Sequence, residues 1–132
     1  MNTQTQEREY NFNEIKAITE IKIKMEERAQ KTLGEKIEMV KDLVLGYYSQ
    51  TWEQINVEDR KRELVKSRHL ITYFMRKKVN LGLCEIGRMF TPSKDHSTIT
   101  HSIRTVKNWR DTDATFRNEF EQLERYINFE LK

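Results

Sequence analysis

Residues 91–104 read Thr-Pro-Ser-Lys-Asp-His-Ser-Thr-Ile-Thr-His-Ser-Ile-Arg, and this stretch decides the fold. Residues 91–94 predict a tight turn, and a helix follows that opens with the small and polar side chains of residues 95–98. Apolar residues then recur at Ile99, Ile103 and Val106, the spacing of a helix with one buried face. A helix that begins with hydrogen-bonding groups and is anchored in a core has the form that reading the DNA major groove requires.

A second, shorter helix is predicted just before this turn. Leu83 to Phe90 places Ile86, Met89 and Phe90 on its inner side, and Gly87 allows close helix packing. The helix after the turn is expected to end near Trp109. Together the two helices form a helix-turn-helix pattern, in which the second helix enters the major groove and the first braces it.

The rest of the chain predicts further helices and no convincing strand. Asn13 is expected to cap a helix that runs to about Lys31, and Gly34 to break the chain before the next helix. The following helices are expected over about 35–48, in a short segment begun by the Thr51–Gln54 capping box, over about 67–79, and after the capping pair Asp111 and Asp113. The charged segment 57–66 is expected to be an exposed loop. The fold class is therefore all-α, a helical bundle that contains a helix-turn-helix.

Charge is unevenly distributed along the 132 residues, although the net charge is only +3. Between Arg60 and Arg110, thirteen lysines and arginines face three acidic residues, whereas the segments on both sides are acidic. A basic middle between acidic flanks is typical of a protein with a polyanionic partner. A solvated basic face on an ordinary helical protein is the alternative that charge alone leaves open.

Composition argues against several other classes. The single cysteine, Cys84, cannot form an internal disulfide. No apolar run approaches the ~20 residues of a membrane span, and residues 1–10 lack the apolar segment of a signal peptide. The expectation is one soluble, cytoplasmic domain without a membrane partner.

The residues of the helix-turn-helix closely resemble a known signature. Leu83-Cys-Glu-Ile-Gly-Arg-Met-Phe90, followed by Lys94-Asp-His-Ser-Thr-Ile-Thr-His101, is similar to the C-terminal DNA-binding domain of the bacterial replication initiator DnaA. Roughly residues 36–130 are covered, of which about 83–104 are specific. The resemblance implies a Trp-repressor-like, DnaA C-terminal-like helix-turn-helix domain over residues 36–132, preceded by an N-terminal extension with a helix over residues 1–35. The family's ATPase loop, Gly-x-x-x-x-Gly-Lys-Ser/Thr, does not occur.

The resemblance also implies roles for individual residues. Side chains expected to contact base edges are Asp95, His96, Ser97 and Thr98 in the major groove and Arg60, from a basic loop, in the minor groove. A shift of register in that loop would put Lys61 or Arg62 in place of Arg60. Side chains expected to hold phosphates are Arg62, Arg68, Arg76, Lys94 and His101. No cofactor and no metal are expected. The partner is double-stranded DNA, with a homo-oligomer or replication proteins as further partners that the sequence leaves open.

The turn departs from the family pattern. Four residues separate Phe90 from Asp95, where the family usually has three, and Pro92 stiffens them. Cys84 stands where the family usually has proline, Ser97 replaces a threonine, and Lys94 replaces an arginine and so gives up bidentate geometry. The mode of binding is therefore better specified than the DNA sequence that is bound.

Three alternatives were weighed against DNA binding. His96 and His101 are five residues apart, which does not suit two metal ligands on one helical face. His101 and Arg104 match the His-x-x-Arg box of tyrosine recombinases, with Tyr126 downstream, but a strand-transfer enzyme needs a further arginine and a larger domain. A helical adaptor that binds only proteins predicts no salt-dependent affinity for DNA. We therefore predict sequence-specific binding without catalysis, in replication initiation, its regulation or transcription regulation.

Overall fold

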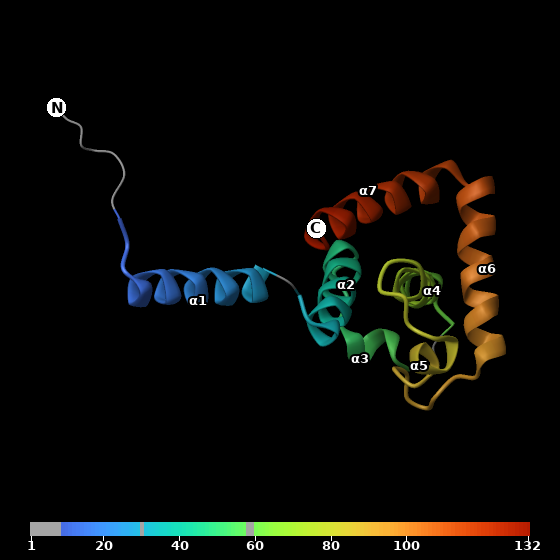
Figure 1. Ribbon diagram of the computed structural model, residues 1–132. Coiled ribbons are helices and arrows are strands. Elements are labelled where there is room, and N and C mark those ends of the chain that lie inside the picture. The colour runs from blue at the N-terminus through green and yellow to red at the C-terminus, as the bar shows by residue number, and fades with distance from the viewer. Residues whose placement is uncertain (1–8, 30, 58–59) are drawn as a thin grey trace. The chain divides into compact units, whose positions relative to one another are not determined.

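The computed structural model describes residues 9–29, 31–57 and 60–132, without the side chains of residues 26–29. Its helices are α1 (Phe12–Ala29), α2 (Leu33–Tyr47), α3 (Trp52–Ile55), α4 (Arg62–Lys77), α5 (Leu83–Gly87), α6 (His96–Thr112) and α7 (Ala114–Glu130) (Figure 1). The described residues contain no strand, so the predicted all-α class is confirmed. None of the helices described is long and apolar enough to cross a membrane.

The chain falls into two compact units, Met1–Lys31 and Thr32–Lys132. In the first unit, the carboxamide of Asn11 caps α1, since its Oδ1 accepts a hydrogen bond from the backbone N–H of Glu14 at 2.8 Å. The prediction that Asn13 is the cap was wrong, because Asn13 lies within the first turn of the helix. The predicted division of the chain between residues 35 and 36 stays a prediction.

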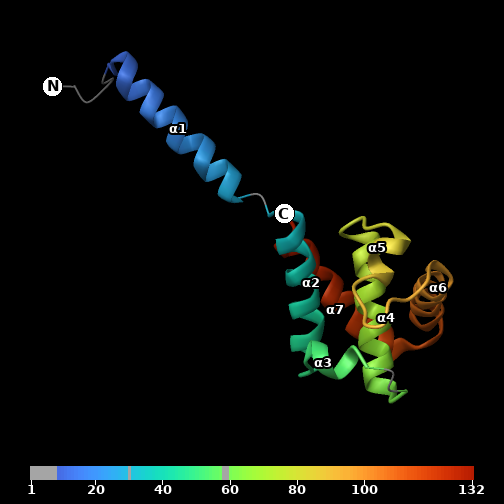
Figure 2. The ribbon, with the colours of Figure 1, turned by 90° about the horizontal axis from the view of Figure 1, so that it is seen from below.

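The second unit is built around α4. Figure 1 shows α4 end-on and α6 lengthwise, and Figure 2 shows the reverse, so the two helices cross steeply. Phe74 of α4 is fully buried, and its ring stacks on that of Phe120 in α7 with 5.2 Å between centroids. Buried side chains from α2, α6 and α7 complete the core around α4: Val40, Val44, Ile99, Val106, Phe116, Leu123 and Ile127.

Two predicted boundaries were wrong. Gly34 does not break the chain but lies in the first turn of α2, which Thr32 caps by accepting a bond from the N–H of Glu35. Helix α4 begins at Arg62 instead of Ser67, so the second half of the expected loop 57–66 is helical. The half-buried Leu64 and Val65 in the first turn of α4 are followed by the polar residues 66–69, which interrupt the apolar spacing that would have marked this part of the helix. Residues 58 and 59 of that expected loop lie outside the described residues.

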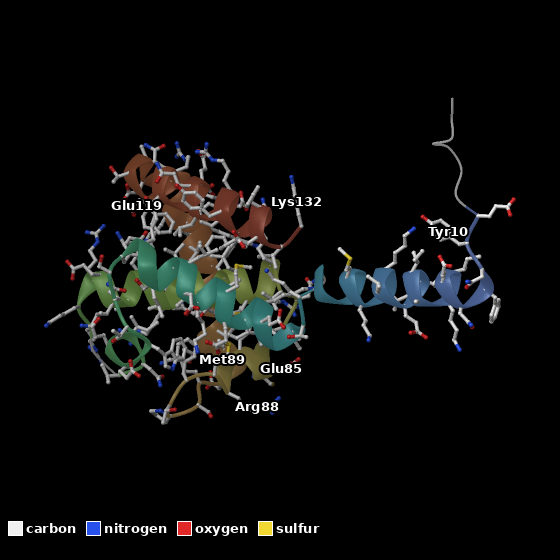
Figure 3. All side chains as sticks on the ribbon, turned by 90° about the vertical axis from the view of Figure 1, so that its left-hand side faces the viewer. Tyr10, Glu85, Arg88, Met89, Glu119 and Lys132 are labelled. Carbon is white, nitrogen blue, oxygen red and sulfur yellow. The ribbon has the colours of Figure 1, made fainter. Side chains whose placement is uncertain are left out.

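The helix-turn-helix has a short first helix. Helix α5 ends at Gly87 and not at the predicted Phe90, and α6 continues to Thr112, past the predicted Trp109. The carboxylate of Glu85 accepts a bond from the N–H of Gly82 at 3.2 Å, which satisfies a donor at the start of α5. Glu85 and the cap residue Arg88 are exposed on the surface of this segment (Figure 3).

Candidate nucleic-acid interface

The first turn of α6 presents the predicted base-contacting cluster to solvent. Asp95 is the N-cap, and its Oδ1 accepts a hydrogen bond from the backbone N–H of Thr98 at 2.8 Å. This bond lowers the pKa of Asp95 below its ordinary value. His96, Ser97 and Thr98 are exposed next to it. The structure therefore brings the four residues together at the start of one helix. Asp95 also caps that helix.

The exposed side of α6 extends beyond its first turn. Ile99 and Val106 are fully buried, and the residues on the opposite side of the helix are exposed: Ser97, His101 and Arg104. Sequence reasoning had considered Arg104 only as part of an enzyme. Its spacing of seven residues from Ser97 was the available signal that both lie on one face.

The turn between α5 and α6 is fixed by a close backbone contact. The N–H of Lys94 donates to the carbonyl of Gly87 at 3.0 Å. A Cβ atom at Gly87 would lie only 2.0 Å from the carbonyl oxygen of Lys94. The glycine thus lets the turn pack against α5, and this contact sets where α6 begins. The sequence predicted close packing at Gly87 but not that its partner is Lys94.

The predicted basic loop lies beside this turn. We use the name α3–α4 loop for the described residues between α3 and α4, which are Asn56, Val57, Arg60 and Lys61. Arg68 of α4 donates from Nη1 to the carbonyl of Val57 in this loop at 3.0 Å. Asn56 accepts at Oδ1 a bond from the backbone N–H of Thr91, in the turn before α6, at 2.9 Å. The start of this loop thus lies beside the turn before α6, and Arg60, further along the loop, is exposed.

The predicted phosphate contacts lie around this region. Arg62 is 85% exposed, and its Nη2 is 3.9 Å from Asp113 Oδ2, a long and solvated pair. Lys94 Nζ lies 5.6 Å from the centroid of the Phe90 ring. Arg76 donates from Nη1 to the carbonyl of Leu81 at 3.0 Å near the other end of α4. A guanidinium carries five N–H donors, so one internal bond is compatible with holding a phosphate.

Behind the exposed face, His69 of α4 lies between two rings of α6. Its ring centroid is 6.4 Å from that of His101 and 5.5 Å from that of Trp109. Its Nδ1 is buried and has no hydrogen-bond partner. Burial, followed by the charges of His101, Arg68 and Lys94, lowers the pKa of His69 to about 4. No prediction from the sequence had singled out this histidine, because its burial arises only when α4 and α6 pack.

This burial predicts that the protein loses stability in mild acid. In the folded state the pKa of His69 is about 4, and in the unfolded chain it is about 6.5. The unfolded chain therefore binds the proton more readily, and stability is lost as the pH falls through 6.5 toward 4. Between pH 7 and pH 5 this histidine is expected to lower the free energy of unfolding by about 2 kcal/mol.

Urea denaturation of wild type and of His69→Leu at both pH values measures this effect. The variant, which has no titrating group at this position, should lose about 2 kcal/mol less than wild type between pH 7 and pH 5. Equal losses in the two proteins would contradict the assignment of the pH dependence to His69.

The structure does not assemble the three residues of the strand-transfer alternative. His101 lies about three turns before the end of α6, and Tyr126 lies about three turns after the start of α7. The two helices diverge from their junction at Asp113 (Figure 1). Among the described residues, no group of three or more histidines, cysteines and carboxylates could hold a metal ion.

Comparison with known proteins agrees with this geometry. The sequence model of the family described as "Bacterial dnaA protein helix-turn-helix" matches residues 37–106, which is more than half of the chain. The chain belongs to this DnaA helix-turn-helix family. The resemblance predicted from residues 83–104 is confirmed, and so is the predicted helix-turn-helix fold.

Relatives of the chain are full-length chromosomal replication initiator proteins DnaA. The protein from Bacteroides fragilis is 29% identical over 91 residues, which are 69% of this chain and 19% of the relative. That from Mesorhizobium japonicum is 31% identical over 93 residues, and that from Borrelia turicatae is 32% identical over 92 residues, each covering 70% of this chain and 19% of the relative. The chain thus spans about a fifth of the length of these relatives.

A solved structure shares the fold. The crystal structure of a DNA replication initiation factor superposes with a TM-score of 0.65 and 26% sequence identity. The similarity covers 95% of this chain and 39% of the other. The all-helical arrangement described above is therefore that of a known member of the replication initiation class.

Proposed function

We propose that the chain binds double-stranded DNA at preferred sequences, with α6 in the major groove and the α3–α4 loop in the minor groove, and that it catalyses no reaction. One observation carries this proposal. The start of the α3–α4 loop, which carries the exposed Arg60, is tied to the turn before the exposed polar start of α6 by the Asn56–Thr91 hydrogen bond and to α4 by the Arg68–Val57 bond. Two reading elements in adjacent grooves of one duplex need such an arrangement.

The base contacts follow from the chemistry of the exposed side chains. His96 and the hydroxyls of Ser97 and Thr98 can bond base edges, and the Thr98 methyl can contact a thymine methyl. Asp95 can accept from a cytosine amino group through the oxygen that does not cap the helix. Arg60 would enter a narrow, A·T-rich minor groove, where the potential is most negative.

The phosphate contacts surround these groups. Arg62, Arg68, Arg76, Lys94 and His101 are proposed to hold the DNA backbone and to fix the register of α6 without selecting a sequence. Arg104 is added to this set because it is exposed on the same face of α6 as His101. Arg62 and Arg76 lie at opposite ends of α4, about 21 Å apart along the helix, which suits contacts on both sides of a groove.

The biological setting is proposed from the relatives. Each is named a chromosomal replication initiator protein. The chain is proposed to act on the bacterial nucleoid in replication initiation, in its regulation by competition for shared sites, or in transcription regulation. Replication proteins or further copies of the chain are its proposed protein partners.

Selection of bound duplexes from a random pool tests the proposed function. We expect wild type to enrich a defined sequence, and His96→Ala to lose preference at one or two positions of that sequence at about 1–3 kcal/mol per base pair. His101→Ala is the matched control, because a phosphate contact should weaken all duplexes alike. Equal binding of all duplexes by wild type, unaffected by His96→Ala, would sink the proposal.

Arg60→Ala tests the minor-groove contact separately. Removing the guanidinium should reduce preference at the A·T-rich end of the selected site by roughly tenfold and leave preference at the α6 positions intact. Binding of duplexes changed at single base pairs, measured by fluorescence anisotropy, separates the two ends. Preference at the A·T-rich end that matches wild type would refute the role of Arg60.

A further inference from the structure

The start of the α3–α4 loop is held in place from three directions. Its first residue, Asn56, is the C-cap of α3, and its backbone N–H donates to the carbonyl of Trp52 at 2.8 Å. The ring of Trp52 stacks on that of Phe90, just before the turn, with 5.4 Å between centroids. The carbonyl of Val57 accepts from Arg68 of α4.

A fourth attachment joins the loop directly to the backbone of the turn. The Asn56 side chain accepts from the N–H of Thr91, four residues before the N-cap of α6. Four residues also separate Asn56 from Arg60 in the other direction along the chain. The bond therefore joins two segments, each of which carries one of the proposed DNA-reading groups four residues further along the chain.

This bond can be removed by changing one side chain, Asn56, which is not among the proposed DNA contacts. The donor is a backbone amide, which substitution cannot remove, and the acceptor is a carboxamide oxygen. Asn56 is half-buried and has none of the charge that holds phosphates. Its Oδ1 is engaged by the backbone of the turn, so the contribution proposed for it is to hold the geometry of the two segments.

We propose that Asn56 is a positioning residue for DNA recognition: its side chain fixes the α3–α4 loop to the turn before α6, so that Arg60 and the first turn of α6 meet the duplex as one unit. This inference rests on the proposed function. A displacement of about 1 Å between the two elements is enough to misplace a side chain against a base edge.

The free protein gives the first test. In Asn56→Ala, amide hydrogen exchange at Thr91, followed by NMR, should become at least about tenfold faster, because the donor loses its partner. Asn56→Asp retains an acceptor oxygen and should keep exchange at Thr91 slow. Asn118→Ala, which truncates an exposed asparagine on α7, is the matched control and should leave Thr91 unchanged. Unchanged exchange at Thr91 in Asn56→Ala would overturn the proposal.

DNA binding gives the second test. Asn56→Ala should lower preference at the A·T-rich end of the selected site by roughly 3- to 10-fold, while affinity for unrelated duplexes stays within about twofold of wild type. Asn56→Asp should restore that preference, although its added charge lowers affinity for every duplex. In the double variant with Arg60→Ala, the two losses should be less than additive, because both act through the same contact.

The outcomes separate this inference from the function on which it rests. Faster exchange at Thr91 combined with wild-type preference in Asn56→Ala would show a structural bond with no part in recognition. Losses of preference that add fully in the double variant would also contradict the positioning role. A wild-type chain that selects no sequence would instead refute the proposed function itself, and the positioning role would fall with it. That result would be known before any variant is made.

Discussion

Gly87→Ala is expected to abolish sequence-specific DNA binding. The new Cβ would lie 2.0 Å from the carbonyl oxygen of Lys94 and 3.0 Å from its carbonyl carbon. Both are backbone atoms, so the clash cannot be relieved by a side-chain rotation, and the turn that leads into α6 must move. Overpacking of this kind costs about 1–3 kcal/mol of stability. The bond from the Lys94 N–H to Gly87 would also be strained.

The displaced turn should also weaken DNA binding, because α6 begins directly after it. Affinity for the selected duplex should fall by at least about 100-fold, toward the value for unrelated duplexes, since phosphate contacts tolerate displacement better than base contacts. Urea denaturation and anisotropy titration measure the two effects on the same preparation.

Gly46→Ala is the matched control for this substitution. A Cβ at Gly46, in the last turns of α2, meets no atom within 4 Å. Alanine there should leave DNA binding unchanged and add up to about 1 kcal/mol of stability through helix propensity. Selective binding by Gly87→Ala at the wild-type affinity would show that the turn does not control the placement of α6.

The second large effect is that of salt. Each phosphate held by a lysine or arginine releases counterions, with a slope of about −0.9 in log affinity against log salt. The proposed contacts of Arg62, Arg68, Arg76, Lys94 and Arg104 give a slope of about −4.5. Raising the salt concentration from 50 to 200 mM should then weaken binding roughly 500-fold. Anisotropy titrations at four or more salt concentrations measure this slope.

Replacing one arginine at a time tests which residues contribute to the salt dependence of binding. Arg62→Ala should make the slope shallower by about one, because its guanidinium is 85% exposed and only weakly paired. Arg125→Ala removes an exposed arginine of α7, outside the proposed interface, and should leave the slope unchanged. A slope near zero for wild type would favour the helical adaptor that binds only proteins.

Local sequence signals predicted the parts of the protein that local interactions form. The Thr51–Gln54 capping box is present, with the Gln54 Oε1 accepting from the N–H of Thr51 at 2.9 Å. Asp113 caps α7, and the predicted apolar residues of that helix are buried. Caps and apolar periodicity involve residues three or four positions apart, so the sequence alone specifies them.

The sequence failed where a helix depends on distant partners. The start of α4, residues 62–69, is polar or charged apart from Leu64 and Val65, and residues 62–66 were expected to be part of a loop. This segment is helical as the start of a helix whose later turns are buried on several sides. Packing of those later turns stabilises the whole helix, so the first turn can be added at a small cost in free energy.

The sequence by itself determined the family, the all-helical fold and the cluster of polar residues from Asp95 to Thr98 at the start of α6. Those features follow from residue types at short spacings, which local physics and the signature of residues 83–104 both encode. Tertiary structure alone decided the contact of Gly87 with Lys94, the bond of Asn56 to Thr91 and the burial of His69. These involve groups 7, 35 and 32 or more residues apart, which meet only because α3, α4 and the helix-turn-helix pack on one another.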